Sequence, residues 1–143
     1  MNLIFLGPPG AGKGTLASMF SESNEIPHIS TGDLFREAVQ NKTELGNQVE
    51  LIMAEGGLVP DSLTTEMVRE RLQRSDCTDG YILDGFPRTI AQAEALIRIS
   101  TVEAAVYFAV PDEDVIRRLS GRRVCARCKA VYHIRSLPPK QDG

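Results

Sequence analysis

The sequence predicts an α/β protein built on a doubly wound parallel sheet with helices on both faces. Short apolar runs of strand length alternate with longer stretches of helical periodicity, the pattern of strand–helix–strand units. A glycine-rich turn stands between the first apolar run and the first helical stretch. The 143 residues contain no internal repeat or low-complexity segment, so we expect one domain with a single core.

Each element follows from its own local pattern. Strands are expected at residues 2–6, 27–30, 81–84 and 104–110. Helices are expected at residues 13–23, 31–40, 43–55, 61–74, 89–99 and 112–120. Thr31 is expected to cap the second helix. From Arg122 onward the helical pattern gives way to a loop or a small β unit.

Composition excludes several classes of protein. Hydrophobic residues make up 42% and charged residues 24% of the chain, too patterned a mixture for a disordered protein. No apolar run approaches the ~18 residues that a membrane span needs. The first residues lack the basic region of a signal peptide. We therefore expect a cytoplasmic protein without membrane association.

The charge is unevenly distributed. Eight of the 16 Lys and Arg residues lie from Arg117 onward, where Asp142 is the only acid. A basic tail of this kind attracts an anion, either nucleic acid or the phosphates of a nucleotide. Tyr132 is the one aromatic residue there, so the stacking platform of a nucleic-acid site is missing. Nucleotide phosphate is the favoured ligand and nucleic acid is not expected.

The glycine-rich turn carries the most specific motif. Residues 7–15 fit the pattern G-x-x-x-x-G-K directly after a strand and before a helix, the context that a phosphate-binding loop requires. Its glycines let backbone N–H groups converge on phosphate oxygens, and Lys13 reaches the β- and γ-phosphates. A plain turn with a surface lysine would not need this context. Gly14 stands where GTPases keep a metal-binding hydroxyl, so Mg²⁺ would be held through water by an acid elsewhere.

Asp84 is the candidate for that acid. It ends an apolar run, and in doubly wound folds the carboxyl end of such a strand faces the phosphate loop. The alternative is that Asp84 caps the turn before Gly85. Arg36 and Arg88 come from separate elements near the same edge and together suit a second phosphate group. Either arginine alone would more often be a solvated surface charge.

The end of the chain contains two further candidate sites. Arg118 and Arg122 are spaced i, i+4 across a helix end, so they either point at one anion or complement the helix dipole. Cys125 and Cys128 form half of a zinc site, with no second pair in the chain to complete it. His133 is either a third ligand or a structural residue. The remaining cysteine, Cys77, is expected to be buried among apolar residues.

Taken together, these motifs resemble those of adenylate kinases. The matching strings are Gly-Pro-Pro-Gly-Ala-Gly-Lys-Gly-Thr at 7–15, Ile-Ser-Thr-Gly-Asp-Leu-Phe-Arg at 29–36, Gly-Leu-Val-Pro-Asp at 57–61, Asp-Gly-Phe-Pro-Arg-Thr at 84–89 with Gln92, Leu-Ser-Gly-Arg-Arg at 119–123, and Tyr132-His133 followed by Pro-Pro-Lys at 138–140. The resemblance covers the whole chain. In nucleoside monophosphate kinases the sequence Gly-Lys-Gly-Thr is usual, so Gly14 becomes expected.

The resemblance implies reversible, Mg²⁺-dependent transfer of a phosphoryl group from ATP to AMP, giving two ADP, by a monomeric enzyme. ATP would be bound by Gly10, Ala11, Gly12, Lys13, Gly14, Thr15, Arg118 and Arg122. AMP would be bound by Thr31, Arg36, Gly57, Leu58, Val59, Gly85, Phe86, Pro87, Arg88 and Gln92. The catalytic residues would be Lys13, Asp84, Arg88, Arg118 and Arg122, with Asp84 ordering the water shell of Mg²⁺.

The resemblance also implies a domain organisation. Residues 1–29 and 60–121 would form the core, 30–59 the AMP-binding segment, and 122–143 the first half of a lid that carries Cys125 and Cys128. We expect the chain to stop inside that lid, before the final core strand, with structural Zn²⁺ held poorly. Two alternatives follow: a weak or inactive nucleotide-binding fragment, or a parent enzyme that prefers another nucleoside monophosphate.

Overall fold

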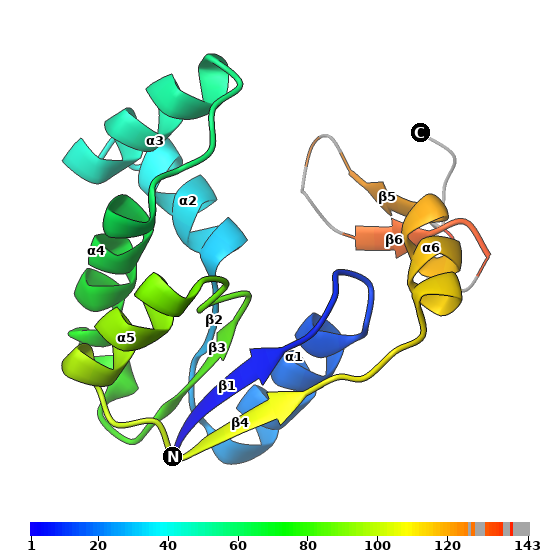
Figure 1. Cartoon of the computed structure of the whole chain (residues 1–143), viewed down its shortest axis with the longest axis horizontal. Coiled ribbons are helices and arrows are strands. Elements are labelled where there is room, and N and C mark those ends of the chain that lie inside the picture. Colours follow the sequence, from blue (N-terminus) through cyan, green and yellow to red (C-terminus); the bar gives the residue numbers. More distant parts are fainter. Residues whose placement is uncertain (126, 128–130, 136–137, 139–143) are drawn as a thin grey trace. The chain divides into compact units, whose positions relative to one another are not determined.

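The computed structural model describes residues 1–125, 127, 131–135 and 138. Its main element is a parallel sheet in the order β2-β3-β1-β4 (Figure 1). The strands are β1 (Asn2–Leu6), β2 (His28–Ser30), β3 (Tyr81–Asp84) and β4 (Ala104–Tyr107). The carboxyl ends of these strands lie at one edge, the edge at which such sheets bind ligands.

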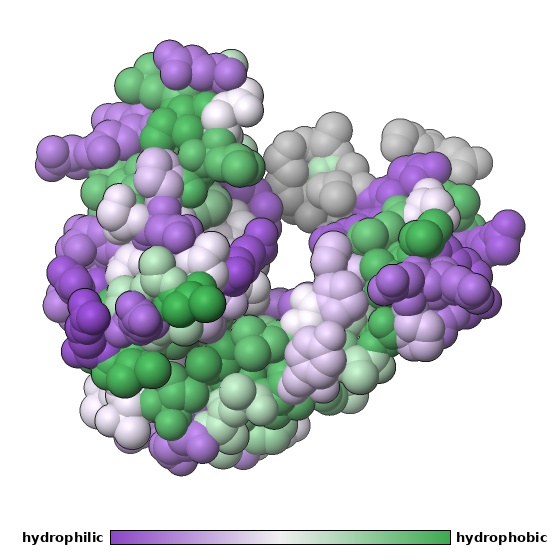
Figure 2. All heavy atoms as spheres, in the orientation of Figure 1, coloured by the Kyte–Doolittle hydropathy of each residue, from purple (hydrophilic) through white to green (hydrophobic). Residues whose placement is uncertain are grey.

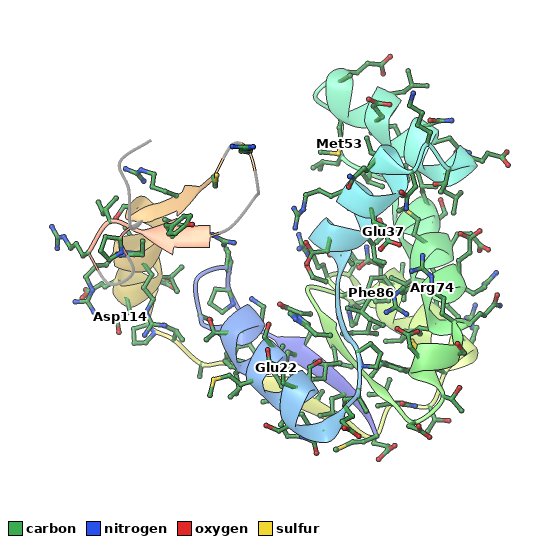
Figure 3. The ribbon with its side chains drawn as sticks, turned by 180° about the vertical axis from the view of Figure 1, so that it is seen from behind. Glu22, Glu37, Met53, Arg74, Phe86 and Asp114 are labelled. Carbon is green, nitrogen blue, oxygen red and sulfur yellow. The ribbon has the colours of Figure 1, made fainter. Side chains whose placement is uncertain are left out.

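The two central strands are apolar because both of their faces are covered. Leu3, Ile4 and Phe5 of β1 are at most 7% exposed, and Ile82 and Leu83 of β3 are fully buried. Parallel sheets with helices on both sides require such continuous apolar strands. Two helices supply the cover in the two opposite views: α1 (Lys13–Asn24) lies on one face and α5 (Ile90–Ile99) on the other (Figures 1 and 3). The predicted fold class is therefore confirmed.

β4 differs from its three neighbours. It ends at Tyr107 rather than at the expected residue 110, because the pairing with β1 ends where Leu6 meets Tyr107. All four of its residues are exposed. Figure 2 shows hydrophobic surface in the region of the sheet. Val106 and Tyr107 are the large side chains that β4 leaves exposed.

The remaining helices lie close to their predicted positions. They are α2 (Thr31–Gln40), α3 (Glu44–Ala54), α4 (Asp61–Leu72) and α6 (Asp112–Ser120). A 3₁₀ turn, η1 (Ser75–Cys77), follows α4 and was not predicted. The predicted cap at Thr31 is wrong. Ser30 holds the N-cap position and Thr31 already lies inside α2, because the chain passes from β2 into the helix without a loop.

The hydrophobic core joins the sheet to helices α2–α5. Its fully buried members include Phe86, Val49 and Val68, and it also contains Leu96 of α5. Outside this core, Arg74 Nη1 lies 3.0 Å from Glu37 Oε1 and joins the chain after α4 to α2 (Figure 3). Both of these side chains are largely exposed, so this ion pair contributes little to stability.

Cys77 is buried beside an ion pair at the end of this core. Arg71 donates to both carboxylate oxygens of Asp76, at 2.8 and 2.7 Å, and to Cys77 Sγ at 3.2 Å. The bond to Asp76 raises the pKa of Arg71, and the same bond lowers the pKa of Asp76. Burial raises the pKa of the Cys77 thiol above its usual value. As predicted, Cys77 is buried in the hydrophobic core.

The chain divides into two compact units. One comprises Met1–Leu6 and Lys13–Tyr107, and the other comprises Gly7–Gly12 and Phe108–Gly143. In the second unit, β5 (Arg122–Val124) pairs antiparallel with β6 (Val131–His133). Of the two structures expected after Arg122, a loop or a small β unit, the chain therefore forms the β unit. The partition into core, AMP-binding segment and lid stays a prediction.

Candidate active site

The glycine-rich turn connects β1 to α1 in a conformation that needs glycine. Gly7, Gly10 and Gly12 have φ angles of 141°, 79° and 95°, values that residues with a Cβ rarely adopt. Helix α1 then begins at Lys13. The first N–H groups of a helix have no carbonyl partner within it, so they bind anions together with the dipole. The predicted order of strand, loop and helix is confirmed.

Helix α6 packs against the turn. Arg118 Nη1 donates to the Gly10 carbonyl oxygen at 3.3 Å, and a Cβ on Gly10 would lie 3.4 Å from the Leu119 side chain. Arg122 is exposed at the first position of β5, and its side chain makes no hydrogen bond or ion pair within the described residues. Of the two predicted arginines, the structure therefore brings Arg118 to the loop.

Asp84 lies beside the first turn of α1. It is the last residue of β3, and a Cβ on Gly14 would lie 3.4 Å from its Oδ2 atom. The same oxygen lies 3.3 Å from His28 Nε2. Since Gly14 follows Lys13 directly, the carboxylate is next to the segment predicted to bind the triphosphate. The absence of a side chain at Gly14 leaves this space open.

The sequence analysis does not single out His28. Its Nδ1 lies 3.4 Å from Ser18 Oγ and its Nε2 faces Asp84, so one ring links α1 to the end of β3. Only 18% of the His28 side chain is exposed. The sequence offered one signal for a role of His28: a polar residue at the start of a short strand.

Three predicted site residues meet at the next turn. Thr31 Oγ1 and Arg88 Nε both donate to the Gly85 carbonyl oxygen, at 3.3 and 2.7 Å. Thr31 is 4% exposed, whereas Arg88 is exposed. The Nη groups of Arg88 make no hydrogen bond with the described residues. The guanidinium is thus held at one nitrogen and offers the other two to an anion.

Other predicted AMP-binding residues have different surroundings. Phe86 is fully buried in the core and anchors the turn, and a cis peptide bond joins it to Pro87. Arg36 pairs with Asp33 on the exposed surface of α2. Leu58 is 94% exposed in the connection between α3 and α4, where Gly57 precedes it. Val59 packs against the core.

Gln92 is buried, with both ends of its amide occupied. Its Oε1 accepts from the Arg88 backbone N–H at 2.7 Å, and its Nε2 donates to Asp61 Oδ1 at 2.7 Å. Its side chain therefore lies beside Arg88, as the predicted site requires. The sequence analysis does not assign a role to Asp61, although Asp61 belongs to one of the matching strings.

The predicted zinc ligands are only partly described. Cys125 is half-buried after β5, while Cys128 lies outside the described residues. Within residues 1–125, 127, 131–135 and 138, no group of three or more His, Cys, Asp and Glu side chains could hold a metal ion. His133 lies in β6, and a Cβ on Gly121 would lie 2.4 Å from its Nε2 atom, so its ring packs tightly against the end of α6.

Known proteins resemble this chain along its whole length. The family model described as adenylate kinase matches residues 5–140. This chain belongs to the adenylate kinase family. An adenylate kinase of Thermosipho africanus is 54% identical over 148 residues, covering 100% of this chain and 69% of the relative. An adenylate kinase of Treponema denticola is 56% identical over 143 residues, covering 100% of this chain and 68% of the relative.

The adenylate kinase family match extends across both compact units of the chain. It includes the phosphate loop, the turn with Arg88 and most of the second unit. In the part of the chain that the structure describes, no helix is long and apolar enough to cross a membrane.

Proposed function

We propose that this protein transfers the γ-phosphoryl group of ATP to AMP and releases two ADP. One observation supports two phosphate sites: β1 and β3 are parallel neighbours, with Phe5 paired to Asp84. The chain leaves β1 into the phosphate loop and leaves β3 into the turn that contains Arg88. Two neighbouring strands that end at one sheet edge, each followed by a candidate anion-binding segment, suit a phosphate donor and a phosphate acceptor.

We assign the donor to the phosphate loop. The backbone of residues 10–15 and the ammonium group of Lys13 would hold the ATP phosphates, and we assign Arg118 and Arg122 to ATP as well. We assign the acceptor to Thr31, Arg36, Gln92, the connection at Gly57, Leu58 and Val59, and the turn of Gly85, Phe86, Pro87 and Arg88. The alternative readings of Asp84 as a plain turn cap and of Arg88 as a solvated charge have less support, since both side chains have specific partners.

The reaction requires no covalent enzyme intermediate. An oxygen of the AMP phosphate attacks the γ-phosphorus of ATP, and the bond from that phosphorus to the β-phosphate oxygen breaks to release ADP. Catalysis then consists of alignment and of cationic groups that neutralise the charge on the passing phosphoryl group. We assign this neutralisation to Lys13 and Arg88 of the first unit and to Arg118 and Arg122 of the second, with Arg118 donating to the Gly10 carbonyl oxygen.

The residues around Asp84 fit Mg²⁺ held through water. Mg²⁺ keeps several of its waters and binds through one or two carboxylates and substrate phosphates. Asp84 provides a carboxylate beside Gly14, which has no hydroxyl that could bind the metal directly. Bound there, Mg²⁺ would neutralise phosphate charge. Zinc binding by Cys125 and Cys128, a cytoplasmic location and a monomeric state stay predictions.

A panel of acceptors tests the substrate assignment. We expect the protein, assayed with ATP and Mg²⁺, to phosphorylate AMP with a higher kcat/KM than UMP, CMP or GMP. Four residues carry this expectation, because the resemblance to adenylate kinases assigns them to AMP: Thr31, Arg36, Arg88 and Gln92. Each rate is measured by chromatography of the nucleotide products. Preference for UMP or CMP would assign the protein to another branch of the nucleoside monophosphate kinases.

A further inference from the structure

Asp61 connects two helices at the acceptor side of the sheet. It is the first residue of α4, and its two carboxylate oxygens accept separate hydrogen bonds. Oδ2 accepts from Thr89 Oγ1 and Oδ1 accepts from Gln92 Nε2, both at 2.7 Å. Thr89 is the N-cap of α5. One carboxylate therefore ties the start of α4 to the start of α5.

The bond to Gln92 extends this connection to Arg88. Gln92 is 5% exposed, and its Oε1 accepts from the Arg88 backbone N–H at 2.7 Å. The orientation of the amide follows from its partners, because a backbone N–H can only donate and an ionised carboxylate can only accept. The chain of contacts runs from Asp61 through Gln92 to the backbone of the residue whose guanidinium is held at Gly85.

We infer that Asp61 is a positioning residue for the acceptor phosphate. Asp61 orients the Gln92 amide, and the amide holds the backbone of Arg88. The Arg88 side chain, with its Nη groups, therefore extends from a fixed backbone position. The inference rests on the proposed function, which gives Arg88 its anion. The simpler interpretation is that Asp61 only complements the dipole of α4, as acids in a first helical turn do.

Asp112 provides a matched control for that simpler interpretation. It is the first residue of α6 after Pro111, as Asp61 is the first residue of α4 after Pro60. Asp112 is exposed, and its side chain makes no hydrogen bond or ion pair with the described residues. Removing either carboxylate removes the same interaction with a helix dipole. Only the removal of Asp61 releases Gln92.

The first comparison is Asp61→Ala against Asp112→Ala. We expect Asp61→Ala to raise the KM for AMP about tenfold, because a buried amide donor loses its partner and Arg88 its fixed backbone. The KM for ATP should change less than about twofold, since the phosphate loop is untouched. Asp112→Ala should leave both constants unchanged. Equal effects of the two substitutions on the KM for AMP would show that Asp61 only complements the dipole of α4, and the inference would be wrong.

A reciprocal exchange of amide and carboxylate tests the path through Gln92. In Gln92→Glu two carboxylates face each other, and the KM for AMP should rise about tenfold or more. Adding Asp61→Asn lets the amide introduced at position 61 donate to the carboxylate introduced at position 92, whose other oxygen still accepts from Arg88 N–H. The double variant should return to within about threefold of wild type. Gln92→Glu combined with Asp112→Asn has the same net charge and should stay impaired.

The double variant also distinguishes positioning from direct contact with the base of AMP. If the Gln92 amide also contacts AMP directly, Asp61→Asn would restore the contact with the Arg88 N–H without restoring the KM, and the inference would stand. Failure of the double variant to restore protection of the Arg88 N–H would overturn the inference. Thermal melting of every variant shows whether each is folded at the assay temperature. A difference in the KM for AMP between variants of equal Tm cannot come from a change in global stability.

Hydrogen exchange at the Arg88 amide separates this inference from the proposed function. We expect NMR of the nucleotide-free protein to show faster exchange of Arg88 N–H in Asp61→Ala and Gln92→Glu, and protection restored in the double variant. If wild type lacks AMP-dependent turnover but shows this exchange pattern, the proposed function fails, whereas the path from Asp61 through Gln92 to the Arg88 backbone stands. If turnover depends on AMP but exchange at Arg88 is unchanged in every variant, the inference fails alone.

Discussion

Replacing Lys13 with Met should lower kcat for ADP formation by about 10²–10³-fold, the usual effect of removing one preorganised charge from a transition state. Lys13 is the first residue of α1, directly after the glycine-rich turn. Its ammonium group has no substitute in a Met side chain of similar length, so the γ-phosphoryl group would pass between nucleotides with less charge neutralisation. Initial rates at saturating ATP and AMP measure the effect.

Lys42→Met is the matched control for this substitution. Lys42 is exposed just after α2, so the same change of side chain there should leave kcat within about twofold of wild type, as is usual for surface substitutions. The Tm of both variants should stay near that of wild type. A Lys13→Met variant with at least half of the wild-type kcat would contradict the role of the loop in catalysis.

The second large effect concerns stability, at the contact between α2 and α3. Gly46 lies in α3 and is buried, and a Cβ built on it would lie 2.0 Å from the Ala38 carbonyl oxygen. Gly46→Ala must therefore push α3 away from α2 and loosen the packing of Val49, which is fully buried. We expect a loss of about 3 kcal/mol in the free energy of unfolding, or roughly 10 °C in Tm.

Gly32→Ala is the control for Gly46→Ala. Gly32 also lies in a helix, but a Cβ there would meet the flexible end of Arg36 at 3.3 Å rather than backbone. Alanine in a helix is favoured over glycine by about 1 kcal/mol, so this variant should keep or raise the Tm. Calorimetry of both variants decides the question. A Gly46→Ala protein that melts within about 2 °C of wild type, a margin of about 1 kcal/mol or less, would contradict the close approach of α2 and α3.

The sequence predicted those features that depend on local patterns. The apolar run at residues 2–6, the glycine-rich turn and the helix after it all have periodicities or backbone requirements that a short window reveals. The strand predicted at residues 104–110 is longer than β4, because β4 ends where its pairing with β1 ends. The predicted cap at Thr31 is wrong because Thr31 already lies inside α2. Its hydroxyl donates to the Gly85 carbonyl oxygen, a partner far away in the sequence.

The supporting contacts of the site were beyond sequence reasoning for the same reason. His28 meets Asp84 only because β2 and β3 are neighbours in register. Asp61 meets Gln92 only because α4 packs on α5. Sequence spacing does not encode either pairing. The chemistry-bearing residues were found from motifs, whereas the residues that orient them required the fold.

Product stoichiometry tests the central claim most directly. Equimolar ATP and AMP are incubated with the protein and Mg²⁺, and the nucleotides are followed by ³¹P NMR. The proposed reaction predicts two ADP formed for each AMP consumed, no inorganic phosphate, and the reverse conversion when ADP alone is supplied. Release of inorganic phosphate from ATP at a rate that does not depend on AMP would contradict the account.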